Sequence, residues 1–232
     1  MNKRNFQKEL DALIDNIQKE RVGESAPTLL LHSCCAPCSS YTLEYLSQYF
    51  RVTVLYFNPN IMRKAEYEKR VAEQQRLIEA LNTKLTRNKK HETLNQITLE
   101  PQNRTTVQPQ NHHIGFLSGR YDPREFVDVV RGMEEEPEGG KRCWVCYGLR
   151  LEETAKIAKA GGYDYFCTTL SISPLKHADW LNDIGEQLSQ EYGVRWLPSD
   201  FKKKGGYKRS IELSHEYNLY RQNFCGCEYS RR

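Results

Sequence analysis

The stretch TLLLHSCCAPCSS, residues 28–40, joins an apolar run to a proline and three cysteines. Its first six residues have the composition of a buried strand, and Pro37 suits the first turn of a helix. The stretch therefore predicts a strand that passes directly into a helix. Apolar runs at residues 52–57, 163–170 and 194–197, with a weaker one at 114–117, predict four more strands.

Helical patterns lie between these runs, as in the four-residue repeat of Trp180, Ile184 and Leu188. Strands that alternate with helices favour right-handed crossovers and a parallel sheet covered on both faces. We therefore predict a three-layer, Rossmann-like (HUP-type) α/β fold with a mainly parallel sheet. A mainly helical part that carries cysteines is expected to follow at the C-terminus.

The chain has 232 residues, which fits one domain with an appendage. Residues 1–25 predict an amphipathic helix with Phe6, Leu10, Leu13 and Ile17 on one stripe. Residues 26–232 are expected to form a single α/β catalytic domain. Within it, the polar stretch at about 83–113 resembles an insertion, which we expect to be disordered or to run over the surface.

The net charge of +4 permits a nucleic-acid partner without arguing for one. No window approaches a membrane-spanning apolar helix, and the charged N-terminus lacks the apolar core of a signal peptide. We therefore expect a cytoplasmic protein with no membrane partner. Its eight cysteines would be mostly reduced there, so a cluster of them indicates metal binding or redox chemistry.

Two cysteine groups have the spacing of soft metal ligands. Cys34, Cys35 and Cys38 follow the first predicted strand, and Cys143 and Cys146 form a C-x-x-C motif just ahead of another helix. Pairs of thiolates from both groups would complete a four-thiolate site for zinc or an iron–sulfur cluster. The alternative is a closed zinc site that only staples two helices together.

A third group, Cys225 and Cys227, is separated by one glycine. Such a pair would close a small, strained disulfide, which is readily reduced and suits a dithiol that delivers two electrons. The alternatives are two more metal ligands or an incidental pair on a frayed tail. Cys167 lies in a predicted strand and is expected to act as a small core residue.

Other signals argue against enzymes that bind dinucleotides or triphosphates through glycine-rich loops. The chain has no G-x-G-x-x-G or Walker sequence, and cysteines stand where ATP-using enzymes of similar layout have a Ser-Gly-Gly loop. Tyr121, Asp122 and Asp200 are candidate proton donors, although helix capping or strand-end hydrogen bonding explains each better. His32 is expected to be packed or solvated rather than catalytic.

Seven motifs, taken in order, carry a resemblance to a known family. They are LLLHSCCAPCS, VLYFNPNI, YDPREF, EPEGGKRCWVCYGLRLEETAKIA, FCTTLSISPLK, LPSDFKKKGGYKRSIELS and LYRQNFCGC. Over about residues 26–82 and 114–229 the chain resembles the QueH-type epoxyqueuosine reductases. The resemblance implies a cobalamin-independent oxidoreductase that reduces the epoxide of epoxyqueuosine to queuosine at the wobble position of tRNA.

The resemblance also implies cofactors and site residues. Cys34, Cys35, Cys143 and Cys146 would hold a [4Fe–4S] cluster, with Cys38 as a further candidate ligand and an additional mononuclear iron or zinc ion beside the cluster. Cys225 and Cys227 would be the redox-active pair, which an unidentified electron donor reduces again.

The stretch DFKKKGGYKRS predicts a phosphate-binding edge for the tRNA. Its basic residues are Lys202, Lys203, Lys204, Lys208 and Arg209. A charge run is by itself usually a solvated face, and the position of this run inside the matched region is what favours RNA binding. The remaining alternative for the whole chain is a zinc-stapled RNA-binding module without catalysis, which would need neither iron nor a reducible pair.

Overall fold

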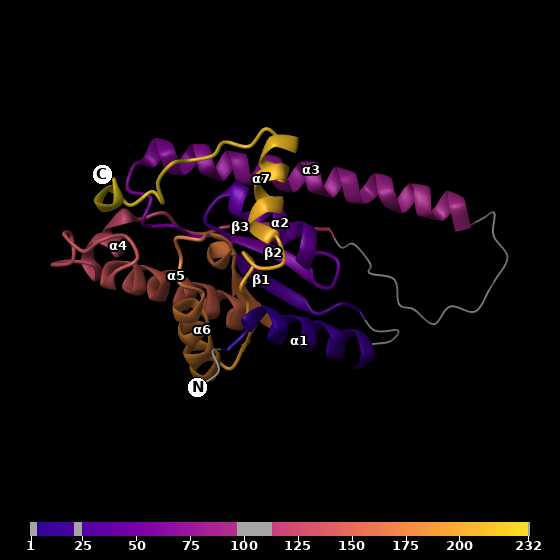
Figure 1. Ribbon diagram of the computed structural model, residues 1–232, viewed down its shortest axis with the longest axis horizontal. Helices are drawn as coiled ribbons and strands as arrows, with labels where there is room; N and C mark the ends of the chain where they lie inside the picture. Colours follow the sequence, from indigo (N-terminus) through magenta and orange to yellow (C-terminus); the bar gives the residue numbers. More distant parts are fainter. Residues whose placement is uncertain (1–3, 21–24, 97–112, 232) are drawn as a thin grey trace.

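The computed structural model describes residues 4–20, 25–96 and 113–231, and Figure 1 shows a parallel sheet between two groups of helices. Five strands form the sheet in the order β3-β2-β1-β4-β5, and every neighbouring pair is parallel. The strands are β1 (Thr28–His32), β2 (Arg51–Tyr56), β3 (Gly115–Ser118), β4 (Tyr165–Thr168) and β5 (Arg195–Trp196). The predicted three-layer, Rossmann-like α/β fold and all five predicted strands are confirmed.

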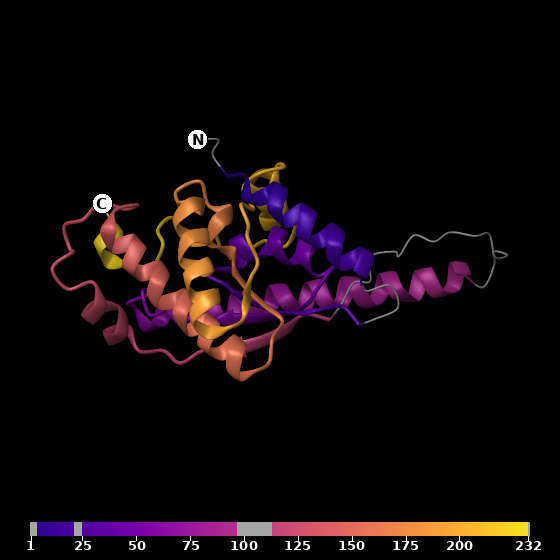
Figure 2. The ribbon, with the colours of Figure 1, turned by 90° about the horizontal axis from the view of Figure 1, so that it is seen from below.

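One face of the sheet is covered by α2 (Ala36–Leu46), α3 (Lys64–Gln96) and α7 (Gly206–Glu216), which pack against one another. On the other face α5 (Lys141–Ala160) packs against α6 (Ala178–Tyr192), as Figure 2 shows from below, and α4 (Pro123–Val129) packs beside α5. No described helix is long and apolar enough to cross a bilayer.

The central strand β1 is apolar on both faces because helices cover both. Leu29, Leu30 and Leu31 are all fully buried, and Leu31 pairs with Val54 of β2 and Cys167 of β4. Chain order reverses at β1, since β2 and β3 lie on one side of it and β4 and β5 on the other. In open parallel sheets this switch point, at the carboxyl ends of the strands, is where ligands bind.

The N-terminal helix α1 (Phe6–Glu20) buries Phe6, Leu10 and Ile14. Its Asp11 carboxylate pairs with Lys204 at 2.5 Å and accepts a hydrogen bond from Tyr45 of α2. The helix is therefore fastened to the face that α2 and α7 cover. The division into an N-terminal helix and one catalytic domain stays a prediction.

Two segments differ from expectation in their local structure. Helix α3 continues to Gln96, so the expected polar insertion at 83–113 begins as helix, and residues 97–112 of it lie outside the described part of the chain. After α7 the chain is irregular except for a short 3₁₀ helix, η2 (Glu228–Ser230), so Cys225 and Cys227 lie on coil rather than on a helix. Hydrogen bonds from neighbouring elements hold this coil in place.

Candidate functional site

Seven of the eight cysteines line one cavity of about 240 Å³. The walls come from the start of α2, the start of α5, the segment between β4 and α6, and the C-terminal coil. Cys167 is the exception, being fully buried in β4 with its Sγ 3.3 Å from the carbonyl oxygen of Leu197. The fold therefore gathers the three cysteine groups that the sequence singled out, although they lie far apart along the chain.

The first group is a compact trio made by Cys34, Cys35 and Cys38. The strand β1 ends just before Cys34, Cys35 is the N-cap of α2, and Cys38 lies in the first turn of that helix. The three sulfur atoms lie within 4.8 Å of one another, and Cys34 Sγ is 3.8 Å from Cys35 Sγ. A tetrahedral metal site with bonds of about 2.3 Å to sulfur has sulfur–sulfur edges of about 3.8 Å. The trio is therefore spaced as thiolates that share a single metal ion.

Hydrogen bonds within the trio make Cys34 its most acidic thiol. Hydrogen bonds from the Cys35 and Cys38 thiols bring the pKa of Cys34 well below its usual value, and Thr169 adds a further hydrogen bond. The hydrogen bond to Cys34, together with burial, raises the pKa of Cys35 to about 12. Metal binding displaces thiol protons, so metal affinity at this trio rises with pH.

The second group, Cys143 and Cys146, lies on the first turns of α5. Cys143 Sγ accepts a hydrogen bond from the backbone N–H of Gly139 at 3.2 Å. Cys146 packs in a small apolar cluster with Phe126 and Cys227, and burial raises its pKa. Among the described residues only the trio forms a set of three sulfurs as close as 4.8 Å, so Cys143 and Cys146 line the same cavity as a separate pair.

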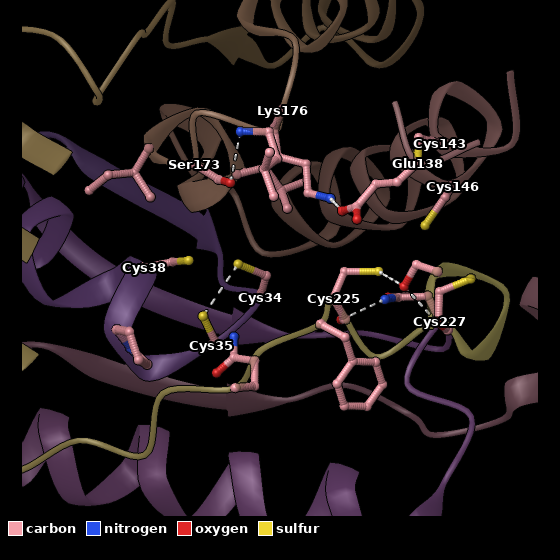
Figure 3. A pocket seen from close by; sticks show the side chains of 18 of the residues that line it. Cys34, Cys35, Cys38, Glu138, Cys143, Cys146, Ser173, Lys176, Cys225 and Cys227 are labelled. Carbon is pink, nitrogen blue, oxygen red and sulfur yellow. Dashed lines mark hydrogen bonds and ion pairs between the residues drawn. The ribbon is translucent and has the colours of Figure 1, made fainter. Parts of the chain in front are cut away.

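The C-terminal pair forms the third part of the cavity (Figure 3). The pKa of Cys225 lies well below its usual value, mainly because the Cys227 thiol donates a hydrogen bond to it and also because the ammonium of Lys176 is near. Burial opposes this shift. The same hydrogen bond and burial raise the pKa of Cys227. Cys225 Sγ also lies 3.2 Å from Ser230 Oγ. Cys225 is thus the more acidic sulfur of the pair, and the thiolate is the form in which a dithiol reacts.

Three buried arginines fix the cavity walls and were not singled out from the sequence. Arg70, 2% exposed, donates to the carbonyl oxygens of Phe224 and Cys225 and pairs with Glu66 at 2.7 Å. Arg142 donates to four backbone carbonyls, among them that of Tyr229. Arg150 donates to the Cys146 carbonyl. Only Arg142 had a signal in the sequence, namely its place directly before Cys143.

Of the candidate proton donors, Asp122 has the helix-capping role that we expected, whereas Tyr121 and Asp200 make other structural contacts. Asp122 caps α4 by accepting from the Arg124 backbone N–H, the Tyr121 hydroxyl donates to the Ile61 carbonyl, and Asp200 pairs with Lys202. None of the three is among the described residues that line the cavity.

His32 is fully buried between Thr168 and the Phe57 carbonyl. Burial, aided by the charge of Arg150, lowers its pKa to about 3. It is therefore a neutral, packed side chain.

The basic stretch lies at the edge of the cavity, since Tyr207 and Ser210 belong to both. Four of its five cations are paired with carboxylates: Lys202 and Lys203 with Asp200, Lys204 with Asp11, and Arg209 with Glu44. Lys208 is exposed and has no ion pair among the described residues. It is the cation of this stretch most available to a phosphate.

Comparison with known proteins gives one family. The sequence pattern that defines "Epoxyqueuosine reductase QueH" matches residues 29–106 and 99–232. The chain is 42% identical over 228 residues to the epoxyqueuosine reductase QueH of Streptococcus pyogenes, covering 98% of this chain and 78% of the relative. It is 40% identical to that of Staphylococcus epidermidis, covering 97% and 84%, and 32% identical to that of Thermotoga maritima, covering 88% and 90%. With this similarity along its length and its cysteines gathered around one cavity, the chain belongs to the epoxyqueuosine reductase QueH family.

Proposed function

We propose that this protein reduces the epoxide of epoxyqueuosine to the alkene of queuosine, at the wobble position of a tRNA and as the last step of queuosine biosynthesis. The observation that carries the proposal is the convergence of seven cysteines on one cavity at the sheet's switch point, beside a basic stretch. The reaction removes the epoxide oxygen as water and consumes two electrons and two protons. The site therefore needs an electron source, a proton source and a group that binds oxygen.

The cysteine set fits a metal cofactor, because soft thiolates from two walls face one enclosed space. We propose that Cys34, Cys35, Cys143 and Cys146 hold a [4Fe–4S] cluster. The spacing of the trio supports an additional mononuclear iron or zinc ion, with Cys38 among its ligands. An iron with an open position supplies Lewis-acid chemistry for the epoxide oxygen, so no cobalamin is required.

The two electrons come from Cys225 and Cys227 in this proposal. Oxidation of a thiolate and a thiol to a disulfide releases two electrons and one proton. The low pKa of Cys225 and the hydrogen bond between the two sulfurs support this role. An external electron donor then reduces the disulfide for the next turnover.

The proposed substrate is a tRNA in the cytoplasm, whose anticodon loop presents an unpaired base. Such a base leaves the loop and enters a pocket, stacking on apolar or aromatic side chains at its rim. Leu175 and Tyr207 line the cavity and are 66% and 38% exposed, respectively. Lys202, Lys203, Lys204, Lys208 and Arg209 form the proposed phosphate-binding edge beside them.

The alternative is a zinc-stapled RNA-binding module, and the single-ion spacing of the trio is the observation in its favour. One experiment distinguishes the reductase from the binding module. The protein is purified and reconstituted without oxygen, and its iron, acid-labile sulfide and visible spectrum are measured. The comparison uses the wild-type protein and its Cys34→Ser, Cys38→Ser and Cys143→Ser variants. Cys167→Ala serves as the control outside the cavity.

The cluster proposal expects a brown protein that dithionite bleaches, with iron and sulfide lost in the Cys34 and Cys143 variants and kept in the control. Incubation with tRNA that carries epoxyqueuosine should then yield queuosine by mass spectrometry of the nucleosides. Cys225→Ser should keep the cluster and lose turnover. Tightly held zinc, no iron uptake and no conversion would refute the reductase proposal in favour of the binding module.

A further inference from the structure

One buried cation of the cavity has no role so far. The side chain of Lys176, in the segment between β4 and α6, is 9% exposed and lines the cavity. Its ammonium donates to Glu138 Oε1 at 2.8 Å, and Figure 3 shows it reaching along the cavity wall toward Glu138, on the side of Cys225. Taking an ammonium out of water is unfavourable, and one ion pair offsets this cost only in part. A site that needs a proton donor would explain why a lysine lies there.

The other buried cations of the cavity cannot donate a proton. Arg70, Arg142 and Arg150 hold backbone carbonyls, and a guanidinium does not lose its proton in a protein. Arg221 also lines the cavity and donates to Ser214 Oγ. Among the described residues that line the cavity, Lys176 is thus the one basic side chain that can release a proton.

We propose that Lys176 is the general acid of this site, whose ammonium gives its proton to the oxygen that leaves the epoxide. This inference rests on the proposed function. Both C–O bonds of the epoxide break and a carbon–carbon double bond forms. The Cys225 thiolate and the Cys227 thiol supply two electrons and close an S–S bond. One proton comes from Cys227 and the other from Lys176, so that the oxygen leaves as water, a neutral amine remains, and charge and atoms balance.

The surroundings of Lys176 couple its proton to the redox state of the pair. Burial by itself lowers the pKa of Lys176, but the charge of Cys225, with Tyr147 and Glu138, raises it above its usual value. Among the described residues, the ammonium also acts to lower the pKa of Cys146 and of Tyr147, against the larger effect of burial. Oxidation removes the negative charge of Cys225, so the ammonium becomes more acidic as the electrons leave. Glu138 is 31% exposed and offers a path for reprotonation from water.

The test is a single-turnover reaction of the pre-reduced holoenzyme with tRNA that carries epoxyqueuosine. Lys176→Arg keeps the charge and the pairing with Glu138 but cannot release a proton, and Lys176→Met removes both. General acid catalysis contributes typically 10²–10⁴-fold, so both variants should lose about 100-fold or more in rate. The matched control is Lys156→Met on the outer surface of α5, where the lysine is 49% exposed and pairs with Glu152. The control should keep the wild-type rate.

A second measurement separates proton donation from a purely electrostatic role. The pH dependence of Cys225 alkylation, read by mass spectrometry of the C-terminal peptide, should stay unchanged in Lys176→Arg. In Lys176→Met it should move to higher pH by about one unit, because the thiolate has lost its cation. Thermal melting checks folding, and Lys176→Met/Glu138→Gln replaces the single variant if the unpaired carboxylate destabilises it.

The outcomes are distinguishable. Loss of turnover in Lys176→Arg with unchanged Cys225 alkylation supports the inference. A wild-type rate in Lys176→Arg would overturn it and leave the proposed function intact. If the wild-type protein itself converts no epoxyqueuosine, the proposed function fails and this inference fails with it.

Discussion

Gly226, between the two C-terminal cysteines, is the position where one methyl group should disturb the site most. Its φ of +106° lies in a region that side chains other than glycine rarely adopt. A Cβ there would lie 2.6 Å from Ile61 Cγ1 and 3.2 Å from Ile61 Cα. We therefore predict that Gly226→Ala pushes the C-terminal coil away from Ile61 and exposes Cys227.

The size of the effect follows from two costs. A residue other than glycine at such a φ costs about 1–3 kcal/mol, and overpacking costs about 1–3 kcal/mol. Even the lower sum, about 2 kcal/mol, raises the population of the open coil roughly 30-fold. Cys227 is only 5% exposed, so its alkylation requires that opening and should accelerate by the same factor.

The assay is the rate of iodoacetamide labelling of the reduced protein, read on the C-terminal peptide. Gly132→Ala is the matched control, because Gly132 has a φ of +81° but nothing within 4 Å of its would-be Cβ. The control should lose some stability from backbone strain without faster labelling of Cys227. Equal labelling rates in Gly226→Ala and the wild-type protein would refute the reasoning, because they would mean that the coil accommodates the methyl group in place.

Three further predictions concern other parts of the site. Arg70→Met removes a buried cation that holds the Phe224 and Cys225 carbonyls, so urea denaturation should give a free energy of unfolding lower by about 3 kcal/mol. In the control Arg131→Met, whose side chain is 76% exposed, the free energy of unfolding should change by about 0.5 kcal/mol or less. Equal losses in the two variants would contradict this account. Cys167→Ala leaves a small cavity beside β4, so thermal melting should show a free energy of unfolding lower by about 1 kcal/mol, with the metal content unchanged. A loss of metal would instead place Cys167 in the site. Lys208 has no ion pair among the described residues, so Lys208→Glu should weaken tRNA binding in a filter assay and lower the slope of log affinity against log salt by about 1. Lys203→Glu should weaken binding less, because Lys203 pairs with Asp200. A larger effect at Lys203 than at Lys208 would place the phosphate-binding edge elsewhere.

Much of the fold could be predicted because its signals are local. Leu29, Leu30 and Leu31 are three consecutive apolar residues, and such a run is typical of a strand covered on both faces. The close approach of Cys35 and Cys38 follows from the first turn of α2, which Pro37 initiates. The structure of the expected insertion was harder to predict, because polar side chains without an apolar face fit a surface loop and an exposed helix equally well. In the structure, the helix α3 continues into it as far as Gln96.

The sequence by itself determined which residue types this protein has for chemistry: three cysteine groups, each at a spacing that indicates metal or redox chemistry. Only the tertiary structure decided that these groups share one cavity, because contacts between residues so far apart in the chain leave no periodic trace in the sequence. The same holds for the buried Arg70, which reaches the Cys225 carbonyl from α3, and for Lys176, which meets Glu138 from another loop. A charged residue looks the same in sequence on a surface as in a core, and only the fold that removes water from it shows the difference.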